Sequence, residues 1–458
     1  MFTEELEVIV QLNNAKSCTS PVSQCKMRLI LACFALFAVP AIAINEKLKE
    51  VFHWNYVDYA WEKPGDREAA IASGEFIPAN NLPLGLEVWK DKLFITIPRW
   101  RDGVVATLTY VKINGHMHDG HMMMHHHLDH DHNDTQASMS SSMSPALIPY
   151  PSFEENRVSL NSSSDAKPIV SVFRVWADNC DRLWVMDTGV ADILGNTKVH
   201  SAPRILIYDL NTDKLLKTYE FKDTDTEQHS FFANIIVDSD PQKCENAFAY
   251  VPDLGGYGLI SYNLAEDKSR RIKHNYFHFD PLAGNMVVGG VNFQWTDGVF
   301  SVALGKSMPD GYRTAYFHCL ASTKEFSVNT RVLKNGDSSK DSYYDFQLVG
   351  DRGADSQSSA SYIHEGTGVM FYTQLQKNSV NCWNTNKPLV QENLAEVASD
   401  NETMIFTNDL KVDREGKLWV LTDKLPVFIY RGLDEKEINY RIFSATVEEA
   451  IAGTSCAP

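Results

Sequence analysis

Residues 180–189 read CDRLWVMDTG and residues 415–423 read EGKLWVLTD, so two distant segments share a charged turn followed by a short apolar strand. The same unit, completed by a polar turn and a second strand, recurs along the chain. It is found at 90–111, 180–210, 245–264, 297–320, 367–383 and 415–432. A short β unit that repeats in this way is typical of small sheets arranged around an axis.

Six such sheets predict an all-β protein, a six-bladed β-propeller with a central channel. The segment FHWNYVDYAW at 52–61 precedes the first unit, and we expect it to complete the last blade and close the ring. A sandwich of two β-sheets is the alternative, because a repeat without strong identity also fits that architecture. Ligands of propellers usually bind at one mouth of the channel, where loops from all blades converge.

The N-terminal region has the pattern of an export signal. Residues 27–43, MRLILACFALFAVPAIA, combine a basic start, an apolar run too short to span a bilayer, and a small-x-small end. We therefore predict a secreted, extracellular protein with no membrane span. The expected domains are an upstream extension plus signal peptide at 1–43 and a propeller at 44–458. Because polar residues precede the signal, Met27 is an alternative start.

Five cysteines remain after the expected signal, and an oxidising compartment favours disulfides over a metal site for them. We expect two disulfides, Cys180 with Cys244 and Cys319 with Cys382. This pairing leaves Cys456 unpaired. Three sequons are consistent with secretion and predict glycosylation at Asn133, Asn161 and Asn401.

The longest interval between units holds a histidine-rich stretch, GHMHDGHMMMHHHLDHDH at 115–132, and a serine-rich tail. Its low complexity predicts a surface insert at about 113–166, outside the framework of the propeller. Neutral imidazoles suit Cu(II), Zn(II) or Ni(II), so surface metal binding is one interpretation, with the candidates His125, His126, His127, His130 and His132. The other is a pH-sensitive loop without a metal role. We expect no cofactor and no metal in the core.

The charge of the chain limits its partners. The formal net charge is −17 over 458 residues, which argues against binding to nucleic acid, because phosphate recognition depends on Lys and Arg. An acidic protein suits a small cationic ligand, although acidity also simply keeps a secreted protein soluble.

Several long motifs, in a fixed order, carry a resemblance to a known family. LGLEVWKDKLFITIPRWRDGVVATL, FRVWADNCDRLWVMDTG, VPDLGGYGLISYNL and FTNDLKVDREGKLWVLTDKLP resemble the insect Yellow family, which includes the major royal jelly proteins. The resemblance runs from about Val51 to about Ser455. It implies a secreted six-bladed propeller with a role in cuticle pigmentation and melanin formation. Some members convert dopachrome, salivary members bind biogenic amines, and royal jelly members are nutritive.

A catecholamine, an indoleamine or a related melanin precursor would need an oxygen for its ammonium group and an aromatic wall for its ring. We expect these from residues at the ends of strands near the channel, where turn formation is the alternative role. The candidates are Trp100, Asp187, Asp253, Phe406, Thr407 and Asn408. Asn408, with Thr407 as a weaker companion, lies in the segment that resembles the ligand-lining part of the family.

The sequence leaves open whether the protein is an enzyme. Conversion of dopachrome needs a base, and His364 and His229 are the weak candidates, since neither stands in a recognisable catalytic motif. Two alternatives remain. One is a non-catalytic structural, nutritive or amine-scavenging protein. The other is a calcium-assisted lactonase-like hydrolase, with Asp187, Asp253 and Asn408 as oxygen ligands. The oligomeric state is not predicted.

Overall fold

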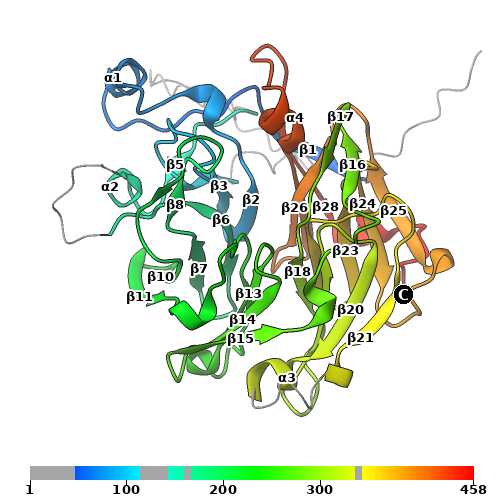
Figure 1. Ribbon diagram of the computed structural model, residues 1–458. Helices are drawn as coiled ribbons and strands as arrows, with labels where there is room; N and C mark the ends of the chain where they lie inside the picture. Colours follow the sequence, from blue (N-terminus) through cyan, green and yellow to red (C-terminus); the bar gives the residue numbers. More distant parts are fainter. Residues whose placement is uncertain (1–46, 114–142, 159–166, 336–342) are drawn as a thin grey trace, which may run out of the picture. The chain divides into compact units, whose positions relative to one another are not determined.

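The computed structural model describes residues 47–113, 143–158, 167–335 and 343–458 (Figure 1). In these ranges the chain forms six four-stranded antiparallel sheets and two two-stranded sheets. The six larger sheets are the blades of a β-propeller, so the predicted fold class is confirmed. The expected signal peptide, Met27, the histidine-rich stretch, Asn133 and Asn161 lie outside the described residues.

Each of the first three blades begins with the strand nearest the axis and continues outward. Blade one consists of β2 (Gly85–Trp89), β3 (Lys92–Thr96), β4 (Leu108–Lys112) and β5 (Ile148–Pro149). Blade two consists of β6 (Val172–Ala177), β7 (Arg182–Asp187), β10 (Arg204–Asp209) and β11 (Lys214–Glu220). Blade three consists of β12 (Ile236–Asp238), β13 (Phe248–Asp253), β14 (Gly258–Asn263) and β15 (Lys268–Lys273).

Blades four and five repeat this order, and blade six differs at its outer edge. Blade four consists of β18 (Val299–Leu304), β19 (Thr314–Cys319), β20 (Lys324–Asn329) and β21 (Gln347–Asp351). Blade five consists of β22 (Ser361–His364), β23 (Val369–Gln374), β24 (Ser379–Asn384) and β25 (Leu394–Ser399). Blade six consists of β26 (Thr407–Val412), β27 (Lys417–Thr422), β28 (Tyr440–Thr446) and β1 (Lys49–Trp54).

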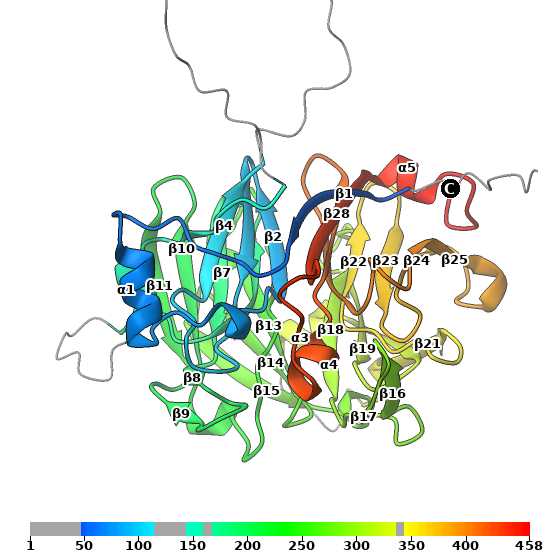
Figure 2. The ribbon, with the colours of Figure 1, turned by 90° about the horizontal axis from the view of Figure 1, so that it is seen from above.

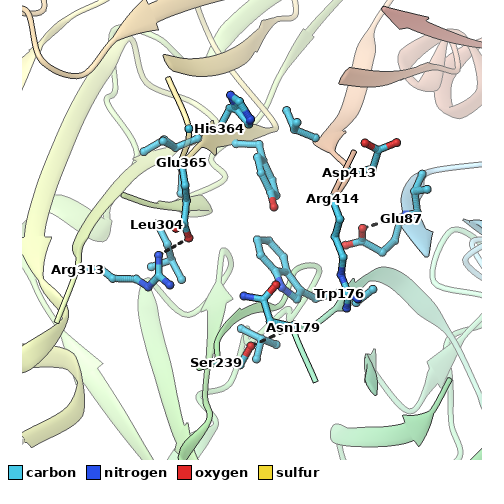
Figure 3. A pocket seen from close by; sticks show the side chains of 18 residues that line it. Glu87, Trp176, Asn179, Ser239, Leu304, Arg313, His364, Glu365, Asp413 and Arg414 are labelled. Carbon is cyan, nitrogen blue, oxygen red and sulfur yellow. Dashed lines mark hydrogen bonds and ion pairs between the residues drawn. The ribbon is translucent and has the colours of Figure 1, made fainter. Parts of the chain in front are cut away.

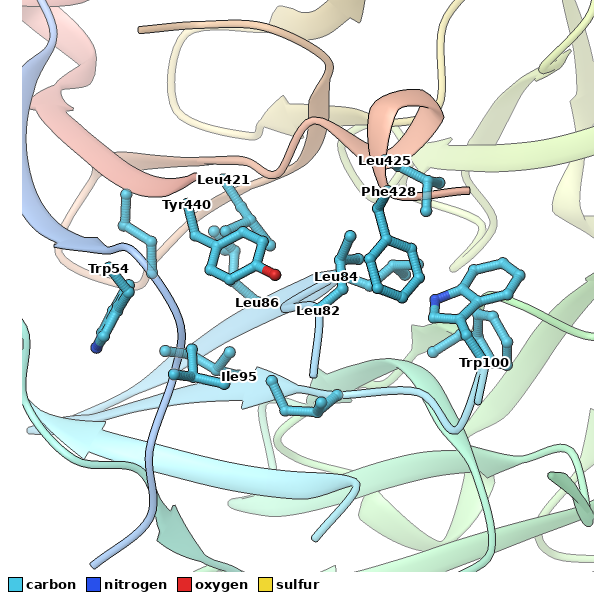
Figure 4. Packing of buried hydrophobic residues seen from close by; sticks show 14 of the residues in the cluster. Trp54, Leu82, Leu84, Leu86, Ile95, Trp100, Leu421, Leu425, Phe428 and Tyr440 are labelled. Carbon is cyan, nitrogen blue, oxygen red and sulfur yellow. The ribbon is translucent and has the colours of Figure 1, made fainter. Parts of the chain in front are cut away.

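Blade six takes its outer strand from the start of the described chain. β1 pairs antiparallel with β28, with His53 opposite Arg441 and Trp54 opposite Tyr440. Figure 2 shows this strand beside β28. The pairing confirms the predicted ring closure, although the closing strand ends at Trp54 and contains only residues 52–54 of the predicted segment 52–61. It also explains why the core runs without a break from blade six to blade one, where Trp54, Tyr440 and Ile95 share one cluster (Figure 4).

The repeat that predicted the propeller has a physical basis in the hairpin between the first two strands of a blade. In blade two the Trp184 indole donates to Asp178 over 2.8 Å, and in blade six the Trp419 indole donates to Asp413 over 2.7 Å. Each carboxylate also accepts backbone N–H groups of its own turn. The same spacing of Asp and Trp therefore ties the turn to the buried strand in both blades.

The remaining elements are short. The helices are α1 (Asp66–Ser73), α2 (Phe153–Asn156), α3 (Thr330–Asn335), α4 (Leu425–Tyr430) and α5 (Val447–Ile451), and the small sheets are β8 (Val190–Ala191) with β9 (Lys198–Val199) and β16 (Asn285–Val288) with β17 (Val291–Gln294). None of the helices in the described ranges is long and apolar enough to cross a membrane.

Two expectations about the repeat differ from the structure. Five of the six sequence units begin at the second strand of a blade, so their leading strands lie one step away from the axis. In the last unit, at 415–432, the strand expected after β27 is absent, because Leu425–Tyr430 forms α4, with Pro at the start of the helix. Within the range 113–166 expected as an insert, β5 and α2 form part of the propeller.

The disulfides correct one predicted pair. Cys180 is bonded to Cys244, as expected, and links blades two and three. Cys382 is bonded to Cys456 instead of Cys319, with the two Cα atoms 6.0 Å apart. The reason is that the tail after α5 packs on blade five. Cys319 is a free, buried thiol on β19 that donates to the carbonyl of His278 over 3.1 Å.

Candidate ligand-binding site

The propeller has a recess at each end of its inner strands, and the two recesses share no lining residue. The first, called here the apolar mouth, lies where the inner strands begin and has a volume of about 250 Å³. The second, called the polar mouth, lies where the inner strands end and has a volume of about 440 Å³ (Figure 3). Their positions follow from the common direction of the inner strands around the axis.

The channel between the mouths is filled by side chains. The Arg174 guanidinium, almost fully buried, donates to the carbonyls of Ser359 over 2.7 Å and Asn408 over 2.6 Å, and lies 3.6 Å from the carboxylate of Asp409. Burial lowers the pKa of Arg174, while Asp409 opposes that shift. The two mouths are therefore separate sites and not the ends of one open tunnel.

Aromatic and aliphatic side chains line the apolar mouth in equal number. Phe173 meets Trp100 and Phe231 edge to face, with ring centroids 5.0 and 4.9 Å away. On the other side Trp295 meets Phe406 edge to face at 5.9 Å. Such crossed rings leave flat, rigid surfaces against which a planar ligand can pack. The wall is continuous with the core through Phe428 and Leu425 of α4 (Figure 4).

Asp297 is the acidic side chain of this aromatic wall. Burial raises its pKa to about 6, and a hydrogen bond from its own backbone N–H only partly opposes that shift. In the described part of the chain no Lys, Arg or His forms an ion pair with it. The carboxylate thus faces an apolar cavity without a counter-charge, although it is mostly ionised near neutral pH.

Asn408 supplies a side-chain amide at the same mouth, and contacts with Asp423 and Arg174 fix the orientation of this amide. Its Nδ2 donates to Asp423 over 2.5 Å, and its Oδ1 lies 3.3 Å from the Arg174 guanidinium. Burial raises the pKa of Asp423 well above its usual range. A further polar atom at this mouth is the indole N–H of Trp100, which is buried and has no hydrogen-bond partner in the described chain.

Three of the six predicted ligand residues line the apolar mouth, namely Trp100, Phe406 and Asn408. Phe406 has φ of 54°, a conformation that bulky residues rarely adopt and that often accompanies functional sites. Thr407 does not line the mouth, because its hydroxyl points back and donates to the carbonyl of Ser379.

Asp187 and Asp253 line neither mouth. Asp187 pairs with Arg204 over 2.9 Å, and Asp253 pairs with Arg271 over 2.7 Å. Asp187 also accepts the backbone N–H groups of Val170 and Ser171, and Asp253 accepts those of Phe231 and Gly256. They stabilise the ends of second strands, which is the structural role that turn-forming aspartates usually have.

The other site candidates are likewise dispersed. His364 lines the polar mouth and its Nδ1 is 3.1 Å from the Thr367 hydroxyl, whereas His229 is exposed and lines neither recess. Asp187 and Asp253 do not converge with Asn408, so this proposed calcium ligand set is not assembled. Among the described residues no group of three His, Cys, Asp or Glu side chains is placed to hold a metal ion. Asn401 is exposed between β25 and β26.

Sequence reasoning missed Asp297 and most of the aromatic wall. Asp297 is the first residue of the sequence unit at 297–320, which begins DGVFSVALG, and Asp-Gly there is indistinguishable from an ordinary turn. Phe231 and Trp295 lie in connecting segments, so no periodicity identifies them. No local signal in the sequence distinguishes Asp297. It stands two residues before β18, and only the structure shows that this unit, unlike the other five, starts with an inner strand.

Comparisons with known proteins agree with this architecture. The family model described as "Major royal jelly protein" matches residues 170–456. Protein yellow of Drosophila yakuba is 38% identical over 413 residues, covering 90% of this chain and 71% of that protein. Protein yellow of Drosophila subobscura is 39% identical over 427 residues, covering 92% and 70%. Virginiamycin B lyase from Staphylococcus aureus superposes with a TM-score of 0.38 and 9% identity, covering 80% of this chain and 96% of that one, which is too loose to bear on function.

Proposed function

Since this chain belongs to the major royal jelly protein family and is similar to the proteins named Protein yellow, we propose that it binds a cationic aromatic amine in the apolar mouth. The ligand class is a catecholamine, an indoleamine or a related melanin precursor. The protein is secreted and takes part in pigmentation. The two disulfides are in keeping with secretion.

The observation that carries the proposal is the unpaired carboxylate of Asp297 in an aromatic cavity. A carboxylate that has lost water without gaining a counter-charge binds a cation more strongly than an exposed one does. The rings of Trp100, Phe173 and Trp295 suit both the flat ring of the ligand and its ammonium group. A ligand with a cation at one end and a planar ring therefore complements this mouth in charge and in shape.

The remaining polar groups favour a ligand with ring oxygens. The Trp100 indole N–H is buried without a partner in the described chain, and a phenolic or quinone oxygen that reached it would satisfy it. Asn408 offers its second Nδ2 hydrogen, because the first is taken by Asp423. The volume of about 250 Å³ lies below the range of roughly 300–1,000 Å³ common for drug-sized ligands, so a one- or two-ring molecule fits better than a larger one.

Calorimetric titration of the full-length mature protein with dopamine and serotonin tests the proposal. Asp297→Asn should weaken binding by about tenfold or more, since it removes the counter-charge and keeps the shape. Glu365→Gln is the matched control, because it neutralises an acid of the opposite mouth. No heat with either amine, or equal binding by wild type and Asp297→Asn, would refute the proposal and leave the structural or nutritive interpretation.

The same carboxylate supports a second, catalytic candidate, the conversion of dopachrome. That isomerisation needs a base to take a proton from carbon beside the iminochrome, with no net oxidation. With its pKa near 6, Asp297 is largely ionised at neutral pH and basic enough for the task. Dopachrome decay followed by absorbance should be faster with wild type than with Asp297→Asn. Equal rates would leave binding as the sole function of the mouth.

A further inference from the structure

The polar mouth has no role in the function proposed above, yet all six blades contribute to it. The ends of the inner strands and the turns after them provide its lining (Figure 3). Trp176 and Tyr362 both line it and are partly exposed. Its volume of about 440 Å³ falls within the range of roughly 300–1,000 Å³ that is usual for small-molecule sites. The recess is therefore large enough to hold a small ligand.

Most charged side chains of this mouth form ion pairs within the protein, and the Asp413 carboxylate accepts backbone N–H groups of its own turn and the indole N–H of Trp419. Arg313 pairs with Asp238 over 3.1 Å and also with Glu365, while Arg414 pairs with Asp181 over 2.7 Å. Glu87 lies 3.8 Å from the ammonium group of Lys411. A charged ligand would have to separate one of these pairs, and each separation has a cost. The mouth is thus matched to a ligand without net charge.

Several hydrogen-bonding groups at this mouth remain unused. The indole N–H of Trp176, the hydroxyl of Tyr362 and the side-chain amide of Asn179 have no hydrogen-bond partner in the described chain. Glu365 and Asp413 add acceptor oxygens beside these donors. Donors and acceptors close together suit hydroxyl groups, because each hydroxyl both donates and accepts.

The ring faces that Trp176 and Tyr362 turn toward each other are not open to a ligand, so their polar atoms and ring edges are the groups that a ligand can contact. Trp176 and Tyr362 stack on one another, with centroids 5.5 Å apart and planes 20° apart, and the Lys411 ammonium lies 4.2 Å from the Trp176 centroid. A planar aromatic ligand would need a free ring face. A compact molecule with many hydroxyl groups needs only the N–H and O–H groups.

We propose that the polar mouth binds a neutral, polyhydroxylated ligand, a sugar of one or two residues, with the Trp176 indole N–H and the Tyr362 hydroxyl as principal donors. This site is independent of the amine site, because the mouths share no residue and the channel between them is filled. The sugar is either free in solution or the terminal part of a glycan.

The test is titration of the full-length mature protein with glucose, N-acetylglucosamine and their β-1,4-linked dimers, followed by calorimetry and saturation-transfer NMR. Trp176→Phe and Tyr362→Phe each remove one donor and keep an aromatic ring. Each should weaken binding roughly three- to tenfold, as expected for one hydrogen bond, and the double variant should weaken it further. Trp295→Phe, at the apolar mouth, is the matched control and should leave sugar affinity unchanged.

Three outcomes would overturn the proposal. These are no binding of any of the four sugars at millimolar concentration, affinity unchanged in both donor variants, and affinity that falls steeply with salt, since a neutral ligand is not screened. Sugars capped with a methyl group at the reducing end separate the two sources. Retained binding shows that the reducing end points out of the site, as the linkage of a glycan end requires, and loss of binding shows that the site needs a free reducing end.

Discussion

The indole of Trp176 in blade two stacks on the phenol ring of Tyr362 in blade five, so residues from opposite sides of the ring meet on the channel axis. Both side chains come from inner strands and line the polar mouth. Together with the buried Arg174 they separate that mouth from the apolar one. Binding at one mouth is therefore expected to be independent of the other.

Trp176→Ala should remove this contact and destabilise the protein. Because Trp176 is only half-buried, we expect a loss of about 1–3 kcal/mol in the free energy of unfolding, below the 3–5 kcal/mol typical of a fully buried tryptophan. Urea unfolding monitored by circular dichroism measures this loss. Amine affinity at the apolar mouth should stay within about twofold of wild type. A large change there would contradict the separation of the two mouths.

Amine binding should depend on pH through Asp297. Burial raises the pKa of this carboxyl to about 6, and only the ionised form neutralises an ammonium group. Affinity should therefore be constant above about pH 7 and fall as the pH drops through 6, approaching about tenfold per pH unit well below it. Titrations with dopamine across this range measure the profile. Asp297→Asn should show weak binding without that inflection, and an unchanged inflection would assign it to another group.

The same raised pKa affects the stability of the protein. Because the folded pKa of Asp297 lies above its unfolded value, the group favours folding most at low pH, and this contribution is lost as the pH rises through about 6. Asp297→Asn should therefore raise the unfolding free energy relative to wild type at neutral pH and not at acidic pH. Denaturant unfolding at the two pH values provides the measurement.

The disulfide between Cys382 and Cys456 should anchor the C-terminal tail to blade five. Replacing both residues with serine is expected to cost about 2–4 kcal/mol of stability, because the bond closes a long loop. Peptide mapping without reduction should recover this pair together with Cys180–Cys244. Cys319→Ser is the control and should leave both bonds intact, and recovery of a Cys319–Cys382 peptide would refute the assignment.

Deletion of Gly115–His132 should leave the propeller and amine binding unchanged. This stretch lies outside the described residues, between β4 and β5 of blade one. Neutral imidazoles bind Cu(II) and Ni(II), so any retention of these metals should disappear with the deletion. Metal-affinity chromatography and amine titration of the same variant measure both effects. Loss of amine binding would place part of the site within the deleted stretch.

The number of blades and the closure of the ring followed from the sequence alone. Turns and apolar strands are local patterns, and the hairpins that carry Asp178 with Trp184 and Asp413 with Trp419 repeat them at the same spacing. Local patterns also identified Trp100, Phe406 and Asn408, because these residues stand next to strand ends. The position of a strand within its blade was harder to predict, since inner and second strands are both short and apolar.

What the tertiary structure alone decided is which side chains share a mouth and which carboxylates are paired. Asp187 and Asp297 look alike in sequence, as aspartates at the edge of a strand, yet Arg204 neutralises the first and no cation of the described chain neutralises the second. The choice between Cys319 and Cys456 as the partner of Cys382 likewise depended on where the C-terminal tail packs. Contacts between distant segments set burial and counter-charge, and these quantities determine the chemistry of a carboxylate or a thiol.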